Sequence, residues 1–140
     1  MKSDTTVATL QEKGFRITNA RRQLIEIIKR SNSPLTVQEL GKKLGKKGIA
    51  VNKSTIYREI SFLIEQGIAA EIDFGDRKKR YESTHIGHHH HLICLKCSNI
   101  QDVTLKNELE DEEERIAKEN KFMISHHSLE FFGFCNQCKP

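Results

Sequence analysis

Four consecutive histidines, His88 to His91, stand directly before a Cys-x-x-Cys pair in the segment HHHHLICLKC. A second such pair lies near the end of the 140 residues, and the chain has no other cysteine. Two such pairs suit a structural zinc site, because four thiolates close a tetrahedron around the ion and leave no position for substrate. The alternative, a thioredoxin-like redox motif, needs a pair at a helix N-terminus, whereas both flanks here indicate strand ends. The predicted ligands of one structural Zn²⁺ are Cys94, Cys97, Cys135 and Cys138.

The histidine run predicts two further half-sites. If residues 88–94 form a strand, successive side chains point to opposite faces. His88 and His90 then share one face, while His89 and His91 share the other, so each face offers two metal ligands. Spacing alone does not choose the completing ligands; the candidates along the chain are Glu82, Asp102, Glu110, His126 and His127.

The charge of the chain divides between its halves. Residues 1–83 carry a net charge of +7 and residues 84–140 a net charge of −3. A basic half beside an acidic, ligand-rich half indicates two tasks, the first of which can involve nucleic acid. The chain shows no apolar run of about 20 residues and no secretory signal, so we expect a cytoplasmic protein without a membrane partner.

Helix signals fill the basic half. The pattern predicts a short helix over residues 5–13 and a second helix capped by Thr18. The segment TVQE at 36–39 has the form of a capping box and predicts a third helix, in which Thr36 and Glu39 satisfy each other's exposed amides. A fourth helix is expected after Asn52 and up to Gly67.

The fourth helix has two distinct faces. Its aliphatic stripe, which we expect to be buried, comprises Ile56, Ile60, Leu63 and Ile64. Its outward polar side chains are Ser54, Tyr57, Arg58 and Ser61. Such a face suits a DNA major groove, although an ordinary surface helix has a similar pattern. The segment 67–82 reads as strand, turn and strand with a basic run from Arg77 to Arg80 beyond the tip, so the order of elements predicts a winged helix.

Three segments, STIYREISFLIEQGI, HHHHLICLKC and SHHSLEFFGFCNQC, resemble the ferric uptake regulator (Fur) superfamily of metal-dependent repressors. The resemblance runs from about residue 10 to residue 138. It implies an α+β homodimer, with a winged helix-turn-helix DNA-binding domain at 1–83 and an α/β metal-binding dimerisation domain at 84–140.

The resemblance also implies a role for individual residues. The inter-domain regulatory site falls on Glu82, His89, His91 and Asp102. A second site within the dimerisation domain falls on His88, His90, Glu110 and His127. The residues that match the family's DNA contacts are Tyr57 and Arg58, and Arg16 takes the place of a basic residue that reaches the minor groove. The pattern of the fourth helix and of the wing adds Ser54, Thr55, Lys78 and Lys79 as expected DNA contacts, with the two lysines meeting phosphate.

Two positions depart from the family pattern. Ala20 replaces the proline of the usual Thr-x-Pro-Arg in the segment TNAR, which the start of a helix tolerates. Ser33, Pro34 and Leu35 stand where the family usually has a histidine ligand before the third helix. The regulatory metal is expected to be Zn²⁺ or Fe²⁺, with Mn²⁺ a further possibility, and a site with four side-chain ligands favours tetrahedral zinc.

The expected function is that of a metal-responsive transcriptional repressor that binds inverted-repeat double-stranded DNA operators when metallated. Two alternatives belong to other classes. The first is a His/Cys-rich metal storage or chaperone protein, against which the basic winged helix argues. The second is a metal-dependent hydrolase, for which no general base or nucleophile stands out, so we expect no enzyme and no small-molecule substrate beyond metal ions.

Overall fold

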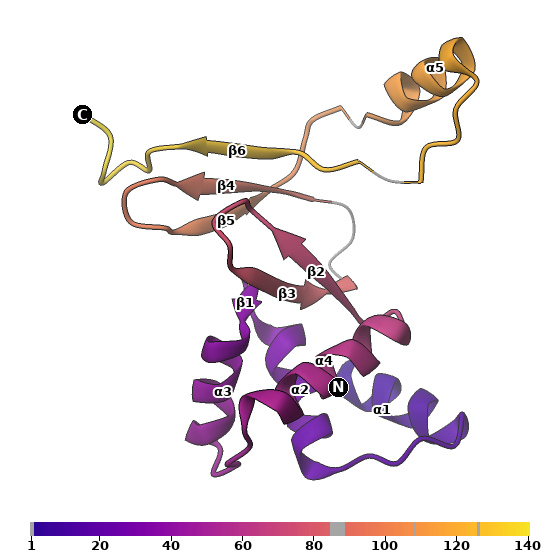
Figure 1. Cartoon of the computed structure of the whole chain (residues 1–140), viewed down its shortest axis with the longest axis vertical. Helices are drawn as coiled ribbons and strands as arrows, with labels where there is room; N and C mark the ends of the chain where they lie inside the picture. The colour runs from indigo at the N-terminus through magenta and orange to yellow at the C-terminus, as the bar shows by residue number, and fades with distance from the viewer. Residues whose placement is uncertain (1, 85–88, 108, 126) are drawn as a thin grey trace. The chain divides into compact units, whose positions relative to one another are not determined.

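The computed structural model describes residues 2–84, 89–107, 109–125 and 127–140, and the chain divides into two compact units, Met1–Gly87 and His88–Pro140 (Figure 1). The boundary expected at 83/84 lies a few residues before this division. Among the described helices, none is both long enough and apolar enough to cross a membrane.

The first unit contains four helices and a small sheet. Its elements are α1 (Lys2–Glu12), α2 (Asn19–Arg30), β1 (Leu35–Thr36), α3 (Val37–Lys46), α4 (Lys53–Glu65), β2 (Ala69–Asp73) and β3 (Lys79–Ser83). The side chains of Thr18, Thr36 and Asn52 cap α2, α3 and α4 by accepting a backbone N–H three residues later. These caps lie where the sequence predicts helix starts, since a Ser, Thr or Asn oxygen satisfies an amide that the first helical turn leaves open.

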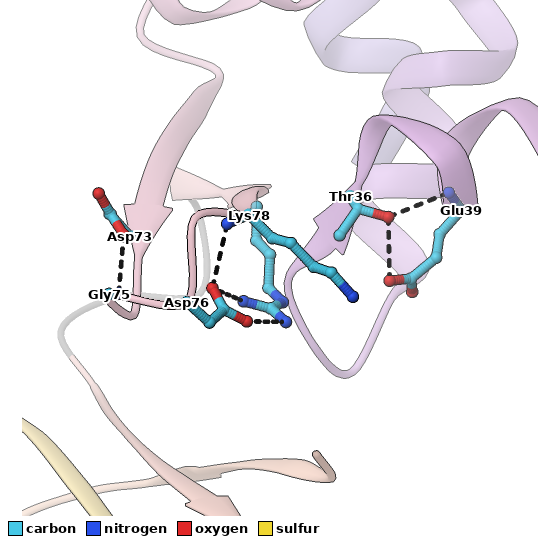
Figure 2. Close-up of polar contacts among 7 residues, drawn as sticks. Thr36, Glu39, Asp73, Gly75, Asp76 and Lys78 are labelled. Carbon is cyan, nitrogen blue, oxygen red and sulfur yellow. Dashed lines mark hydrogen bonds and ion pairs between the residues drawn. The ribbon is translucent and has the colours of Figure 1, made fainter.

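The cap of α3 differs in one bond from the expected capping box. The Thr36 hydroxyl accepts the Glu39 N–H at 3.2 Å, as expected. The Glu39 carboxylate, however, accepts a bond from that same hydroxyl at 3.1 Å rather than from the Thr36 amide (Figure 2). Thr36 is also a residue of β1, where it lies opposite Arg80 of β3, so its backbone belongs to a strand rather than to a free helix end.

The four helices of the first unit bury one apolar cluster between them and the sheet. Its fully buried members are Leu10, Leu24, Ile25, Ile28, Leu40, Leu44, Ile60 and Leu63. The expected burial of Ile64 is wrong, because that side chain is 37% exposed. Each helical residue turns by about 100°, which puts Ile64 at the edge of the stripe formed by Ile56, Ile60 and Leu63.

The sheet of the first unit has the order β1-β3-β2, with both neighbours antiparallel to β3. The hairpin of β2 and β3 is the predicted wing. Its tip turns at Gly75, whose φ of 79° suits glycine. The Asp73 carboxylate accepts the Gly75 N–H at 2.8 Å, and the Asp76 carboxylate accepts the Lys78 N–H at 3.2 Å (Figure 2). Helices α3 and α4 followed by this hairpin form a winged helix.

The second unit is a three-stranded sheet with one helix. Its elements are β4 (His90–Cys94), β5 (Ile100–Val103), α5 (Glu110–Asn120) and β6 (Glu130–Gly133). The strand order is β5-β4-β6, in which β4 runs antiparallel to β5 and parallel to β6. Among its described apolar side chains only Cys94 is buried in the single chain. Those that are exposed are Leu92, Leu95, Ile116, Phe122, Met123, Phe131, Phe132 and Phe134.

Candidate metal centres and nucleic-acid interface

The pairing of β4 with β6 brings the two Cys-x-x-Cys pairs together. Cys94 ends β4 and lies opposite Gly133 at the end of β6. The turn after each strand then carries the remaining cysteines, and the four sulfur atoms all lie within 4.8 Å of one another. The structure therefore gathers the four predicted ligands from positions some 40 residues apart, at the ends of two hydrogen-bonded strands.

The geometry of this cluster fits zinc. The Sγ atoms of Cys97 and Cys135 are 3.8 Å apart, which matches the edge of about 3.8 Å in a tetrahedron of Zn–S bonds. The backbone N–H groups of Cys97 and Cys135 lie 3.5 and 3.4 Å from Cys94 Sγ. By donating to that sulfur they lower the pKa of Cys94 to about 6, which favours the thiolate form that binds metal. All four cysteines are free thiols at strand ends and turns rather than at a helix N-terminus.

A second cluster forms on one face of β4 and the adjacent β5. His91 and Asp102 are cross-strand neighbours, and Asp102 Oδ1 lies 3.5 Å from His91 Nε2 and 4.0 Å from His89 Nε2. The centroids of the His89 and His91 imidazole rings are 4.9 Å apart. Asp102 Oδ1 is buried and accepts no hydrogen bond among the described residues. A buried carboxylate oxygen between two imidazoles is a typical metal-binding arrangement, since a cation would satisfy all three donors.

Glu82, which the resemblance adds to this set, belongs to the first unit. It lies in β3 opposite Ala70 and is buried. The expected N-domain position supplies no histidine, since the side chains of Pro34 and Leu35 carry no ligand atom, and Leu35 pairs with Tyr81 in the sheet. Ala20 lies in the first turn of α2, beyond the Thr18 cap.

The opposite face of β4 holds a different arrangement. The His90 and His127 rings stack with centroids 5.4 Å apart, and His127 Nδ1 is hydrogen-bonded to the Glu113 carboxylate. His90 Nδ1 lies 3.2 Å from the Leu129 carbonyl oxygen. Glu110, the predicted ligand, is exposed at the start of α5, and His88 and His126 lie outside the described residues. Sequence reasoning missed Glu113; its position one helical turn after Glu110 was the available signal.

Only two groups of described residues bring at least three possible ligand atoms within 4.8 Å of one another. They are the four cysteines and the group that contains His89, His91 and Asp102. The stacked histidines on the other face, with Glu113, are not such a group among the residues that the structure describes.

The polar face of α4 is exposed as expected. Ser54, Tyr57, Arg58 and Ser61 all face solvent, with Tyr57 half exposed. Thr55 is partly buried and donates its N–H to the Asn52 cap at 2.9 Å. Arg16, Lys78 and Lys79 are also exposed.

Arg80, the last residue of the basic run in the wing, does not face solvent. It is buried, holds both Asp76 oxygens at 2.8 and 3.1 Å, and lies 5.2 Å from the Phe74 ring centre. Its guanidinium holds the pKa of the Asp76 carboxyl below its usual range. The exposed cations of the wing are therefore Arg77, Lys78 and Lys79. Arg80 instead stabilises the turn through its two hydrogen bonds to Asp76.

A winged helix with an exposed polar recognition helix, joined to a sheet that bears two ligand clusters, defines a metal-binding regulator of the winged-helix class. The model of the ferric uptake regulator family matches residues 12–132. This chain belongs to the ferric uptake regulator family. It is a metal-responsive transcriptional regulator and not an enzyme, and this membership decides against the storage and hydrolase hypotheses.

Relatives and solved structures agree with this assignment. A peroxide-responsive repressor PerR of Staphylococcus epidermidis is 31% identical over 137 residues, which cover 97% of this chain and 89% of that protein. A ferric uptake regulation protein of Rhizobium leguminosarum bv. viciae is 36% identical over 122 residues, 87% of this chain and 85% of that protein.

The folds are also alike. The ferric uptake regulator of Helicobacter pylori superposes with a TM-score of 0.79 at 22% identity, covering 96% of this chain and 89% of that structure. A zinc-bound manganese uptake regulator superposes with a TM-score of 0.69 at 35% identity, covering 89% of this chain and 94% of that structure.

Proposed function

We propose that this regulator is a cytoplasmic homodimeric repressor that binds inverted-repeat operators in double-stranded DNA when its regulatory site holds a metal. The observation that carries the proposal is the convergence of His89, His91 and Asp102 on one face of the sheet. Those histidines directly follow the segment that joins the two units.

Glu82 is the proposed fourth ligand. It lies in β3, close before the joining segment and seven residues from His89. An extended chain of seven residues spans at most about 25 Å. A carboxylate from the wing would make the metal a bond between the DNA-reading unit and the sheet. Metal binding is thereby converted into a fixed orientation of α4 relative to a second subunit.

Zinc is the proposed regulatory metal. With no histidine at 33–35, the proposed set provides four side chains. Fe²⁺ and Mn²⁺, which take more ligands, would need water to complete the site.

The proposed DNA contacts come from three places in the first unit. Tyr57 and Arg58, with Ser54 and Thr55, would read the major groove from α4. Arg16 would enter the minor groove, and Lys78 and Lys79 would meet phosphate. The exposed apolar side chains of β4 and β6 support a homodimer, because water would otherwise cover Phe131 and Phe132.

The test uses duplexes selected from a random library by the zinc-loaded protein. We expect an inverted repeat, bound at lower free Zn²⁺ than free Fe²⁺ or Mn²⁺ in anaerobic titrations followed by fluorescence anisotropy. Glu82→Gln should remove the metal dependence. Glu71→Gln is the matched control, since Glu71 is a carboxylate of the same hairpin that lies 3.6 Å from Lys79 and belongs to neither group of possible ligand atoms among the described residues. Full metal activation in Glu82→Gln would contradict the proposed ligand, and a direct-repeat or unselective site would contradict the dimer.

A further inference from the structure

A polar cluster inside the first unit joins the loop before α2 to α4. Its centre is Arg21, whose side chain is 16% exposed, as is that of its partner Glu59 on α4. Arg21 Nε lies 2.7 Å from Glu59 Oε2 and Nη2 lies 3.3 Å from Glu59 Oε1. The third nitrogen, Nη1, donates to the backbone carbonyl of Arg16 at 2.8 Å.

Aromatic side chains complete the cluster. The Arg21 guanidinium carbon lies 3.7 Å from the centre of the Phe62 ring on α4. Phe62 in turn meets Phe15 edge to face, with centroids 5.0 Å apart and planes at 76°. A guanidinium stacked on a ring and bonded through all three nitrogens has its position fixed, since each contact restricts a different direction.

The cluster ties together two parts of the chain that are separate in the sequence. Arg16 lies in the loop between α1 and α2, whereas Glu59 and Phe62 lie on α4, beside the outward Arg58. The N–H groups of Gly14 and Phe15 donate to the carbonyls of Gln11 and Leu10 at 2.9 and 3.0 Å, and Phe15 and Ile17 pack against the apolar cluster. The bond from Arg21 to the Arg16 carbonyl is the contact that joins this loop to the Glu59 pair on α4.

We infer that Arg21 is a positioning residue for DNA reading, which holds the Arg16 loop against α4 so that both meet DNA in one geometry. The inference rests on the proposed DNA-binding function. The loop enters one groove and the helix enters the next, and a fixed spacing between them makes the two contacts cooperative. The loop is already ordered in the free protein, so it loses less conformational entropy when it binds DNA. Arg21 itself need not touch DNA.

The first test does not use DNA. Amide hydrogen exchange in the full-length, metal-loaded protein should rise by about tenfold or more for residues 14–17 in Arg21→Gln. Arg30→Gln is the control, because Arg30 lies on the same helix but is exposed, and among the described residues its ion pair is with Glu26 at 3.0 Å. Unchanged loop exchange in Arg21→Gln overturns the inference, whatever the protein's DNA preference proves to be.

The second test measures affinity for the selected operator and for random duplex. The operator-to-random ratio should fall by roughly tenfold in Arg21→Gln. Arg21→Lys should do no better, since one ammonium cannot reach the three separate acceptors. Glu59→Gln is the sharper variant. Removing its negative charge should by electrostatics alone tighten binding to every duplex, whereas loss of the ion pair should lower the ratio. A Glu59→Gln protein with an unchanged ratio overturns the inference.

A double-mutant cycle separates positioning from general stability. Arg16→Ala should reduce operator affinity by several-fold less in the Arg21→Gln background than in the wild type, because the loop is already displaced. A merely structural role for Arg21 would give equal losses in both backgrounds and so overturn the inference. If the wild type shows no preference for any duplex, the proposed function fails, and the exchange measurement still decides whether the cluster orders the loop.

Discussion

Lys78 and Lys79 are adjacent in the wing, yet their charges are not equally available to a phosphate. Lys79 Nζ lies 3.6 Å from the Glu71 carboxylate on the neighbouring strand. Lys78 forms no ion pair among the described residues, and its backbone N–H is already held by Asp76. Lys79 can therefore bind a phosphate only if its ion pair with Glu71 loosens. Lys78 can neutralise a phosphate without breaking an ion pair, and the DNA then releases the counterion held there.

We predict that Lys78→Ala lowers the slope of log affinity against log salt by about one, on operator and random DNA alike. Lys79→Ala should lower it by less, because Glu71 already offsets part of that charge. The measurement is the binding constant over a series of salt concentrations. Equal reductions in slope for Lys79→Ala and Lys78→Ala would contradict the offsetting role of Glu71, and no change in either variant would exclude both lysines from phosphate contact.

Tyr57→Ala provides the contrast. Its side chain is half exposed, so truncation costs little stability. It should cost about 1–3 kcal/mol on the operator while leaving the salt slope unchanged. An equal loss on random DNA would remove Tyr57 from base reading.

Arg80 marks the limit of sequence reasoning at this scale. In the sequence it is the fourth member of a basic run, and nothing in its neighbours separates it from Lys79. Its burial follows from a position in the central strand β3, between Thr36 of β1 and Ile72 of β2. That pairing is a long-range event, and a run of charges carries no information about it.

At the scale of elements, β4 carries two histidine faces with different surroundings. The face of His91 meets Asp102 across an antiparallel pair. The face of His90 meets His127, which is bonded to Glu113 of α5. The second set lies wholly within one unit, so we expect a metal or hydrogen bonds there to stabilise that unit without acting on the helices that contact DNA.

We predict that His89→Ala or His91→Ala abolishes metal-dependent operator binding while the protein stays dimeric. His127→Ala and Glu113→Gln should lower the melting temperature and leave part of the metal activation. Operator anisotropy during zinc titration, with sedimentation of each variant, measures both effects. If His127→Ala silences the response and His89→Ala does not, the roles of the two faces are reversed.

The strand alternation that separates these faces could be read from four consecutive letters, because the two-residue period is a local property of extended backbone. The caps of α2, α3 and α4 were equally local. Glu113 could not be chosen in the same way. Its meeting with His127 depends on the path of residues 121–129, which no periodicity describes, and the acidic run around it offers several carboxylates at similar positions.

At the scale of the whole molecule, the two units differ in what stabilises the fold of each. The buried apolar cluster, from Val7 to Tyr81, belongs entirely to the first unit. In the second unit no side chain of α5 is buried, and Phe131, Phe132 and Phe134 are 43 to 56% exposed. A unit of this size without an apolar core requires a metal or a partner subunit for stability.

We therefore predict that Cys94→Ser or Cys138→Ser unfolds the second unit and leaves the first folded. Thiolate zinc sites contribute on the order of 10 kcal/mol to the folding of small units, which exceeds what the exposed sheet can supply. Each variant should lose its zinc, sediment as a monomer, and retain the helical circular dichroism and melting transition of the first unit. Lys96→Ser is the matched control, because it introduces the same residue into the same turn at an exposed position that offers no ligand. A Cys94→Ser protein that remained dimeric with wild-type melting would show that the second unit is stabilised by subunit contacts alone, and the four-cysteine zinc site would lose its structural role.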